Sequence, residues 1–190
     1  MKQLSDYSLV LASSSPRRRD ILLSMGLPFM VRVGEASEEI PEGTPPSEAA
    51  VLLARRKALS VAAEEGEILL AADTVVELDG RPLGKPTDAE DAASMLRALS
   101  GRTHAVHTGV AVLAEGRLLS GLASSRVSFR PLSEEEILAY VASGEPSDKA
   151  GAYAIQGGGA AFVSSLSGDR DTVIGLPSRL VLDLLREVLS

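Results

Sequence analysis

Residues 68–76, with the sequence Ile-Leu-Leu-Ala-Ala-Asp-Thr-Val-Val, constrain the fold more than any other stretch of the chain. A run that is apolar at nearly every position is typical of a β-strand covered on both faces. The exception is Asp73, whose charge is costly in such surroundings unless a cation balances it. Because ligand sites of α/β sheets gather at strand ends, we expect Asp73 to be functional. The alternatives are an aspartate that caps a turn and a structural ion pair with Lys85.

Predicted helices and strands alternate along the rest of the chain. Three helix N-termini are predicted by capping residues: Ser15 followed by Pro16, and capping boxes that begin at Thr87 and at Ser133. The pattern predicts an α/β fold with a mixed sheet, formed by a single domain over residues 1–190. The expected strands are 8–12, 29–33, 68–76, 103–114, 118–129, 162–166 and 172–174, and the expected helices are 16–26, 47–66, 87–99, 133–144 and a C-terminal helix from 177.

Composition excludes several classes of function. The 190 residues contain no cysteine and two histidines, which removes disulfides, thiolate nucleophiles, Cys-ligated zinc and His-rich metal sites. A net charge of −7 argues against a nucleic-acid partner, because such binding needs many phosphate contacts. No stretch is apolar enough for a signal peptide or a membrane span, so we expect a cytoplasmic protein. A small phosphorylated ligand in one cationic pocket remains compatible with this composition.

Residues 11–20, Leu-Ala-Ser-Ser-Ser-Pro-Arg-Arg-Arg-Asp, join a predicted strand to a predicted helix. The first N–H groups of a helix are unpaired, and the helix dipole makes that end an anion site. The hydroxyls of Ser13 and Ser15 can donate hydrogen bonds there, and Arg17 and Arg18 can bind phosphate oxygens in a forked geometry. We therefore predict a polyphosphate site, although the loop lacks the Gly-Lys-Ser/Thr ending of a Walker P-loop. The alternative is an ordinary helix cap beside a solvated basic face.

Two further segments carry candidate groups. Lys57 lies on an apolar helix stripe, and the pattern alone favours a side chain that extends outward to solvent. The acidic loop 34–46 contains four glutamates, one of which would form an Mg²⁺ or Mn²⁺ site if it reached Asp73, and spacing does not choose among them.

The glycine-rich segment 144–162 surrounds Gln156, whose amide suits recognition of a base edge but would equally serve to hold a loop. We expect the neighbouring Asp148 and Lys149 to be structural or to lie at a rim.

Several stretches together resemble the Maf family, which comprises nucleoside triphosphate pyrophosphatases once described as septum-formation inhibitors. The resemblance covers nearly the whole chain, in order, and is carried by LASSSPRRRDILLSMGLPF, AADTVVELDGRPLGKPTDAEDAASMLRALSGRTHAVHTGVAV, GEPSDKAGAYAIQGGGAAFV and VIGLP. It implies an elongated α/β fold with a central mixed sheet, two lobes and a cleft, similar to the inosine-triphosphatase group. It also implies hydrolysis between the α- and β-phosphates with a divalent metal, Mg²⁺ or Mn²⁺, in an enzyme that is often a homodimer.

The resemblance assigns roles to single residues. Asp73 matches the proposed general base, and Asp73 with Glu38 would hold the metal. The other positions that match the substrate-binding residues of the family are Ser13, Ser15, Arg18, Lys57 and Lys85.

The chain is similar to the branch that acts on dTTP and UTP, which carries residues matching Arg17, Thr74 and Gln156. It departs from the common pattern at SGDRDTVIGLP, where relatives usually have Tyr and Asn and this chain has Arg170 or its neighbours. The competing hypotheses are a 7-methyl-GTP pyrophosphatase of the sister branch and a non-enzymatic nucleotide-binding regulator of cell division.

Overall fold

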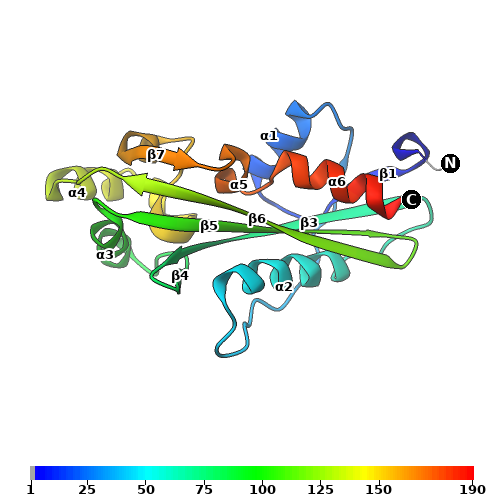
Figure 1. The fold of residues 1–190 in the computed structure, drawn as a ribbon, viewed down its shortest axis with the longest axis horizontal. Coiled ribbons are helices and arrows are strands. Elements are labelled where there is room, and N and C mark those ends of the chain that lie inside the picture. The colour runs from blue at the N-terminus through cyan, green and yellow to red at the C-terminus, as the bar shows by residue number, and fades with distance from the viewer. Residues whose placement is uncertain (1–2) are drawn as a thin grey trace.

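The computed structural model describes residues 3–190, and its largest feature is one long, twisted β-sheet (Figure 1). Within these residues the sheet has seven strands in the order β2-β1-β3-β5-β6-β7, with β4 paired to β3 beside the main path. The pairs of β1 with β2 and β3 are parallel and the other pairs are antiparallel, so the sheet is mixed as predicted. The strands are β1 (Ser8–Leu11), β2 (Met30–Val31), β3 (Glu67–Leu78), β4 (Arg81–Leu83), β5 (Thr103–Ala114), β6 (Arg117–Phe129) and β7 (Val163–Ser167).

Helices cover both faces of the sheet and one end of it (Figure 1). One face carries α2, the opposite face carries α1, α5 and α6, and α3 and α4 lie at the end farthest from the two termini. The helices are α1 (Pro16–Ser24), α2 (Pro46–Leu59), α3 (Ala89–Leu99), α4 (Glu134–Ala142), α5 (Arg170–Ile174) and α6 (Ser178–Val188), with short 3₁₀ segments at Leu4–Asp6, Glu145–Asp148, Ala150–Ala152 and Gly158–Phe162. None of the helices described is both long and apolar enough to cross a membrane.

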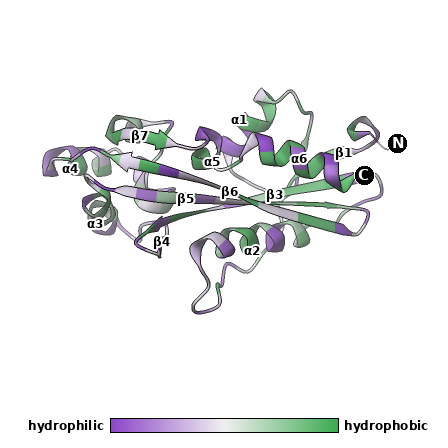
Figure 2. Ribbon diagram, in the orientation of Figure 1, coloured by the Kyte–Doolittle hydropathy of each residue, from purple (hydrophilic) through white to green (hydrophobic). Residues whose placement is uncertain are grey.

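The first half of β3, which Figure 2 colours largely as hydrophobic, is buried on both faces, as its apolar sequence predicts. Ile68 and Leu70 belong to the hydrophobic cluster under α1 and α6, whereas Leu69 and Ala71 belong to the cluster under α2. Successive side chains of a strand point to opposite faces, so Asp73 continues the row that faces α2. The strand therefore delivers one carboxylate to the layer between the sheet and α2.

The order of the strands explains where a ligand can enter. The chain leaves β1 through α1 to β2 on one side, and returns through α2 to β3 on the other side of β1. The loops that follow β1 and β2 thus diverge at the carboxyl end of β1, which is the usual crevice of an open α/β sheet. β1 pairs with β3 only as far as Leu70 and β4 joins at Val76, so on that edge residues 71–75 have no paired strand among the residues described.

Three predicted elements differ from the structure. Residues 172–174 were expected as a strand because of their β-branched side chains, but they end α5, where Thr172 is buried and its carbonyl accepts a hydrogen bond from Thr108 Oγ1 at 2.7 Å. α2 ends at Leu59 and not near residue 66, with Ser60 as its C-cap. The N-cap of α3 is Asp88 and not Thr87, and its carboxylate accepts the N–H of Asp91.

Candidate active site

A cavity of about 780 Å³ lies where the loops after β1 and β2 diverge. This volume falls within the range of about 300–1,000 Å³ typical of small-molecule sites. Its wall includes side chains from segments that are far apart in the sequence. All ten residues predicted from the sequence line this one cavity: Ser13, Ser15, Arg17, Arg18, Glu38, Lys57, Asp73, Thr74, Lys85 and Gln156.

The loop between β1 and α1 forms one wall of the cavity. Ser13 Oγ accepts hydrogen bonds of 3.2 Å from the N–H of Ser15 and from Arg18 Nη1. Ser15 occupies the N-cap position of α1, as predicted, but its hydroxyl makes no capping hydrogen bond. Pro16 has no N–H, and the N–H of Arg19 donates to the Ser15 carbonyl. The Ser15 hydroxyl and the N–H groups of Arg17 and Arg18 therefore remain available to a ligand.

The guanidinium of Arg18 is fixed by hydrogen bonds to the C-cap of α5 and to β3. Its Nε donates to the carbonyl of Gly175 at 2.8 Å, and its Nη2 lies 3.4 Å from Thr74 Oγ1. Thr74 Oγ1 in turn shares a hydrogen bond of 2.9 Å with Thr108 Oγ1. Burial lowers the pKa of Arg18, and the nearby charge of Asp73 opposes that shift. The result is a guanidinium of fixed orientation at the base of the cavity.

Asp73 forms an ion pair with a lysine on α2. Its carboxylate contacts Lys57 Nζ, and the side chains of Asp73 and Lys57 are only 14% and 24% exposed. The prediction that Lys57 extends outward is therefore wrong, because α2 packs close enough to β3 for the ammonium to reach the buried carboxylate. The alternative of an Asp73–Lys85 ion pair is also not what the structure shows. Lys85 is an exposed residue in the cavity wall and makes no hydrogen bond to the residues described.

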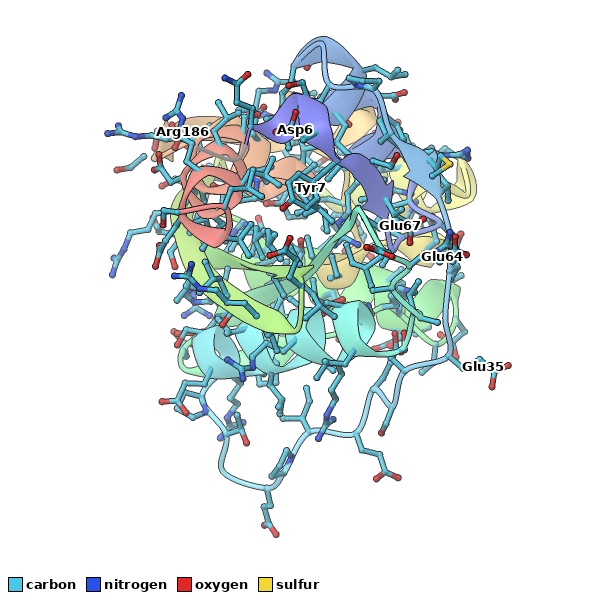
Figure 3. The ribbon with its side chains drawn as sticks, turned by 90° about the vertical axis from the view of Figure 1, so that its right-hand side faces the viewer. Asp6, Tyr7, Glu35, Glu64, Glu67 and Arg186 are labelled. Atoms are coloured by element: carbon cyan, nitrogen blue, oxygen red, sulfur yellow. The ribbon has the colours of Figure 1, made fainter. Side chains whose placement is uncertain are left out.

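The loop after β2 brings one glutamate to the same ammonium. Glu38 Oε1 lies 3.6 Å from Lys57 Nζ. Glu35 lies on the outer side of this loop and points away from the molecule (Figure 3). Of the four glutamates that spacing could not separate, Glu38 is thus the one paired with the Lys57–Asp73 contact.

This loop is fixed at its base and along its length. Arg32, just after β2, makes two hydrogen bonds of 2.8 Å to Glu67 at the start of β3, which lies beside Glu64 in Figure 3. Gly34 packs against α2 so closely that a Cβ there would lie 2.3 Å from the carbonyl oxygen of Ser60. Further along, the Arg56 guanidinium donates to backbone carbonyls on both sides of Glu38.

The family model of Maf-like proteins matches residues 8–188, which is nearly the whole chain. The chain belongs to the Maf family. A protein of Pelotomaculum thermopropionicum named dTTP/UTP pyrophosphatase is 49% identical over 94% of this chain and 95% of its own length. Proteins with the same name from Anaeromyxobacter dehalogenans (50% identical, covering 94% of this chain and 92% of that protein) and Bacillus cereus strain AH820 (47%, covering 93% of each) are similarly close.

Solved structures resemble this Maf chain more distantly. The HAM1 protein of Coxiella burnetii is 18% identical with a TM-score of 0.47, covering 95% of this chain and 99% of that one. The Ham1 protein of Staphylococcus aureus is 14% identical with a TM-score of 0.47, covering 96% and 97%.

The Maf cavity also contains polar residues that sequence analysis did not place in it. Asp148 and Lys149, expected to be structural or at a rim, form an ion pair in the cavity wall, and the hydrogen bond from Lys149 lowers the pKa of Asp148. Thr108 supports Arg18 through Thr74 from the next strand. The position of Asp148 and Lys149 in the glycine-rich segment could have indicated that they belong to the site. No local sequence pattern indicates a role for Thr108.

Proposed function

We propose that this Maf protein is a nucleoside triphosphate pyrophosphatase that hydrolyses dTTP and UTP to the nucleoside monophosphate and pyrophosphate. Support comes from the relatives of that name, which are 47–50% identical over 93–94% of the chain. The observation that carries the proposal is one cavity in which the carboxylate of Asp73 shares a wall with the Ser13–Arg18 loop. That arrangement offers a base for water and a cradle for a polyphosphate.

The polyphosphate tail binds at the N-terminus of α1. The N–H groups of Arg17 and Arg18 and the hydroxyls of Ser13 and Ser15 donate to phosphate oxygens. Arg18 adds a forked pair of charged donors, and its bonds to Gly175 and Thr74 fix its orientation before substrate arrives. Little reorganisation is then needed during the reaction, which is the main source of electrostatic catalysis.

Asp73 acts as the general base. It accepts a proton from a water molecule whose oxygen attacks the α-phosphorus. The bond between the α-phosphorus and the oxygen that bridges to the β-phosphorus breaks, and its electron pair leaves with pyrophosphate. Arg18, Lys57 and Lys85 provide positive charge along the wall where the leaving group's charge develops.

Asp73 and Glu38 fit a divalent cation. Both contact the ammonium of Lys57, so this corner of the cavity already holds a positive charge. Carboxylate oxygens suit Mg²⁺ or Mn²⁺, and Mg²⁺ is commonly bound by one or two carboxylates plus substrate phosphates. In residues 3–190 no group of three or more histidine, aspartate or glutamate side chains is arranged to hold a metal ion. When bound, the ion supplies Lewis-acid polarisation of a phosphate oxygen.

Base selectivity is assigned to Arg17, Thr74 and Gln156. Thr74 acts through Arg18, because its hydroxyl contacts that guanidinium. Gln156 is an exposed residue of the cavity wall, and its side chain makes no hydrogen bond within the described part of the chain, so its amide is available to the base. Uracil and thymine present an acceptor beside a donor, and a single amide offers the complementary pair.

Pyrophosphate release over a panel of triphosphates tests the proposal. With Mg²⁺ or Mn²⁺ present, dTTP and UTP are expected to give the monophosphate and pyrophosphate faster than dCTP, dATP, dGTP or 7-methyl-GTP. Preferential hydrolysis of 7-methyl-GTP would assign the chain to the sister branch. Nucleotide binding without hydrolysis of any member of the panel would favour a regulatory protein.

We also propose, from the family resemblance alone, that the protein is a homodimer in the cytoplasm. Sedimentation velocity of the full chain distinguishes a monomer from a dimer.

A further inference from the structure

We propose that Tyr140, Glu145 and Arg170 form a clamp that positions Gln156 and thereby sets the preference of the enzyme among nucleotide bases. The inference rests on the proposed function, in which Gln156 contacts the base. The three clamp residues do not line the cavity, so they act as positioning residues and not as catalytic ones.

Tyr140 and Glu145 hold the chain on both sides of Gln156. The hydroxyl of Tyr140, at the end of α4, accepts the N–H of Ala154 at 3.0 Å and donates to the Glu145 carboxylate. Glu145 also accepts the N–H groups of Gly158 at 3.2 Å and Gly159 at 3.4 Å. One tyrosine–carboxylate pair thus binds backbone groups two residues before Gln156 and two and three residues after it.

The clamp pair is itself well anchored. The ring of Tyr140 is buried and packs edge-to-face on Phe162 with centroids 4.9 Å apart. Burial, reinforced by the neighbouring carboxylate of Glu145, raises the pKa of Tyr140, which keeps its hydroxyl protonated as a donor. Burial tends to raise the pKa of Glu145, but the hydrogen bonds from Tyr140, Gly158 and Gly159 hold it below its ordinary value.

Gly157, next to Gln156, fits the clamp because it has no side chain. A Cβ at this position would lie 2.0 Å from Glu145 Oε1, which is far inside van der Waals contact. The backbone therefore approaches the carboxylate more closely than any other residue would permit. This contact fixes the turn immediately after Gln156.

Arg170 holds the peptide group immediately before Gln156. From the first turn of α5, its Nη2 donates to the carbonyl of Ile155 at 3.0 Å. Arg170 thus reaches across to the segment that carries Gln156.

The backbone around Gln156 is held by hydrogen bonds, whereas the side chain of Gln156 is not. Peptide groups on both sides of Gln156 are bound by side chains from α4, α5 and the 3₁₀ segment Glu145–Asp148. The amide of Gln156 itself makes no hydrogen bond within residues 3–190, and Gln156 is an exposed residue of the cavity wall. An amide on a rigid support reads donor and acceptor positions more sharply than one on a mobile loop, since misplacement by about 1 Å can cost about 10²-fold in rate.

The test compares base selectivity in Tyr140→Phe, Glu145→Gln and Arg170→Met. Tyr140→Phe preserves shape and removes the hydroxyl, and thermal melting reports whether each variant folds. The readout is the ratio of kcat/KM for dTTP to that for dGTP, with kcat and KM determined separately. Each variant is expected to lower the ratio about 10-fold through a higher KM for dTTP, with kcat changed by less than about 3-fold. Arg179→Met, an exposed arginine on α6, is the matched control and should leave the ratio unchanged.

Two further variants separate positioning from general destabilisation. Gln156→Ala should lower the ratio as much as Arg170→Met, and the double variant should lower it no further, because Arg170 acts on the base only through the position of the Gln156 amide. Arg170→Lys, which retains a donor, should restore part of the ratio. Equal losses for dTTP and dGTP, or additive losses in the double variant, would overturn the inference.

Different experimental results would contradict the clamp and the proposed pyrophosphatase activity. A wild-type protein that releases no pyrophosphate from any nucleotide contradicts the function. In that case equilibrium dialysis of the same variants with dTTP and dGTP tests the clamp, because the ratio of their dissociation constants should change in the same direction. Wild-type activity with an unchanged ratio in all three variants contradicts the clamp alone.

Discussion

Replacing Asp73 with asparagine tests the centre of the proposed mechanism. Asparagine has the same shape and retains one oxygen that can accept a hydrogen bond from Lys57, but it cannot take a proton from water. General-base catalysis contributes about 10²–10⁴-fold to rate. We therefore expect kcat to fall by about 10²-fold or more, which corresponds to about 2.7 kcal/mol of transition-state stabilisation.

The cost to stability should be much smaller than the cost to rate. In the variant the Lys57 ammonium is 24% exposed and still has Glu38 as a partner, so we expect a loss of about 1 kcal/mol, as for an accessible ion pair, and not the loss of about 3–5 kcal/mol that follows from breaking a fully buried one. The ammonium of Lys57 also keeps Glu38 at 3.6 Å. A loss of about 1 kcal/mol lowers the Tm of a chain this long by about 2–4 °C.

The assay measures pyrophosphate release at saturating dTTP with Mn²⁺, alongside thermal melting. The matched control is Asp79→Asn, which makes the same substitution in the turn after β3, where the carboxylate pairs with an exposed arginine, Arg102. The control should turn over at close to the wild-type rate. Turnover of Asp73→Asn within about 3-fold of the wild type, in a folded protein, would refute the role of Asp73 as the base.

Two further predictions concern the fold that supports the site. Burial lowers the pKa of His104 to about 4. The unfolded chain therefore takes up a proton at this residue near pH 6.5, whereas the native protein does so only near pH 4. The free energy of unfolding should fall as pH drops from 6.5 to 4, by at most about 1.4 kcal/mol per pH unit. Urea unfolding at pH 7.5, 5.5 and 4.5 measures this fall, and a His104→Gln variant should show a shallower one; parallel curves would contradict the assignment. Gly109→Ala places a Cβ 2.3 Å from the carbonyl oxygen of Ala50, so α2 must move away from β5 at a cost of about 1–3 kcal/mol. Its Tm should fall and its activity should fall with it, whereas a wild-type melting curve would show that α2 adjusts freely.

The parts of the site that sequence could predict are those whose chemistry is visible in one segment. Asp73 stands out because a charge interrupts an apolar strand, and Ser13 and Arg18 stand out because hydroxyls and cations gather at a helix start. Both signals depend on neighbours along the chain. The mixed sheet follows from the same kind of local pattern, in which long apolar strands alternate with capped helices.

Features that depend on packing between segments were not predictable in this way. Residues 172–174 have side chains that favour a strand, yet the structure places them in a short helix because the Thr172 carbonyl meets Thr108 and the next residues turn at Gly175. The contact of Arg170 with Ile155 likewise joins two segments that are 15 residues apart. Helical or strand periodicity contains no information about either contact.

The direction of Lys57 shows why its partner could not be inferred from α2 alone. Ala50 and Lys57 lie two turns apart on the same face of the helix. Ala50 rests on Gly109 of β5, and Gly109 pairs directly with Asp73 in the neighbouring strand. Since Gly109 has no side chain, the helix lies low enough on the sheet for Lys57 to reach Asp73 and not solvent. A glycine on a third segment therefore determines whether this lysine is a surface residue or part of the site.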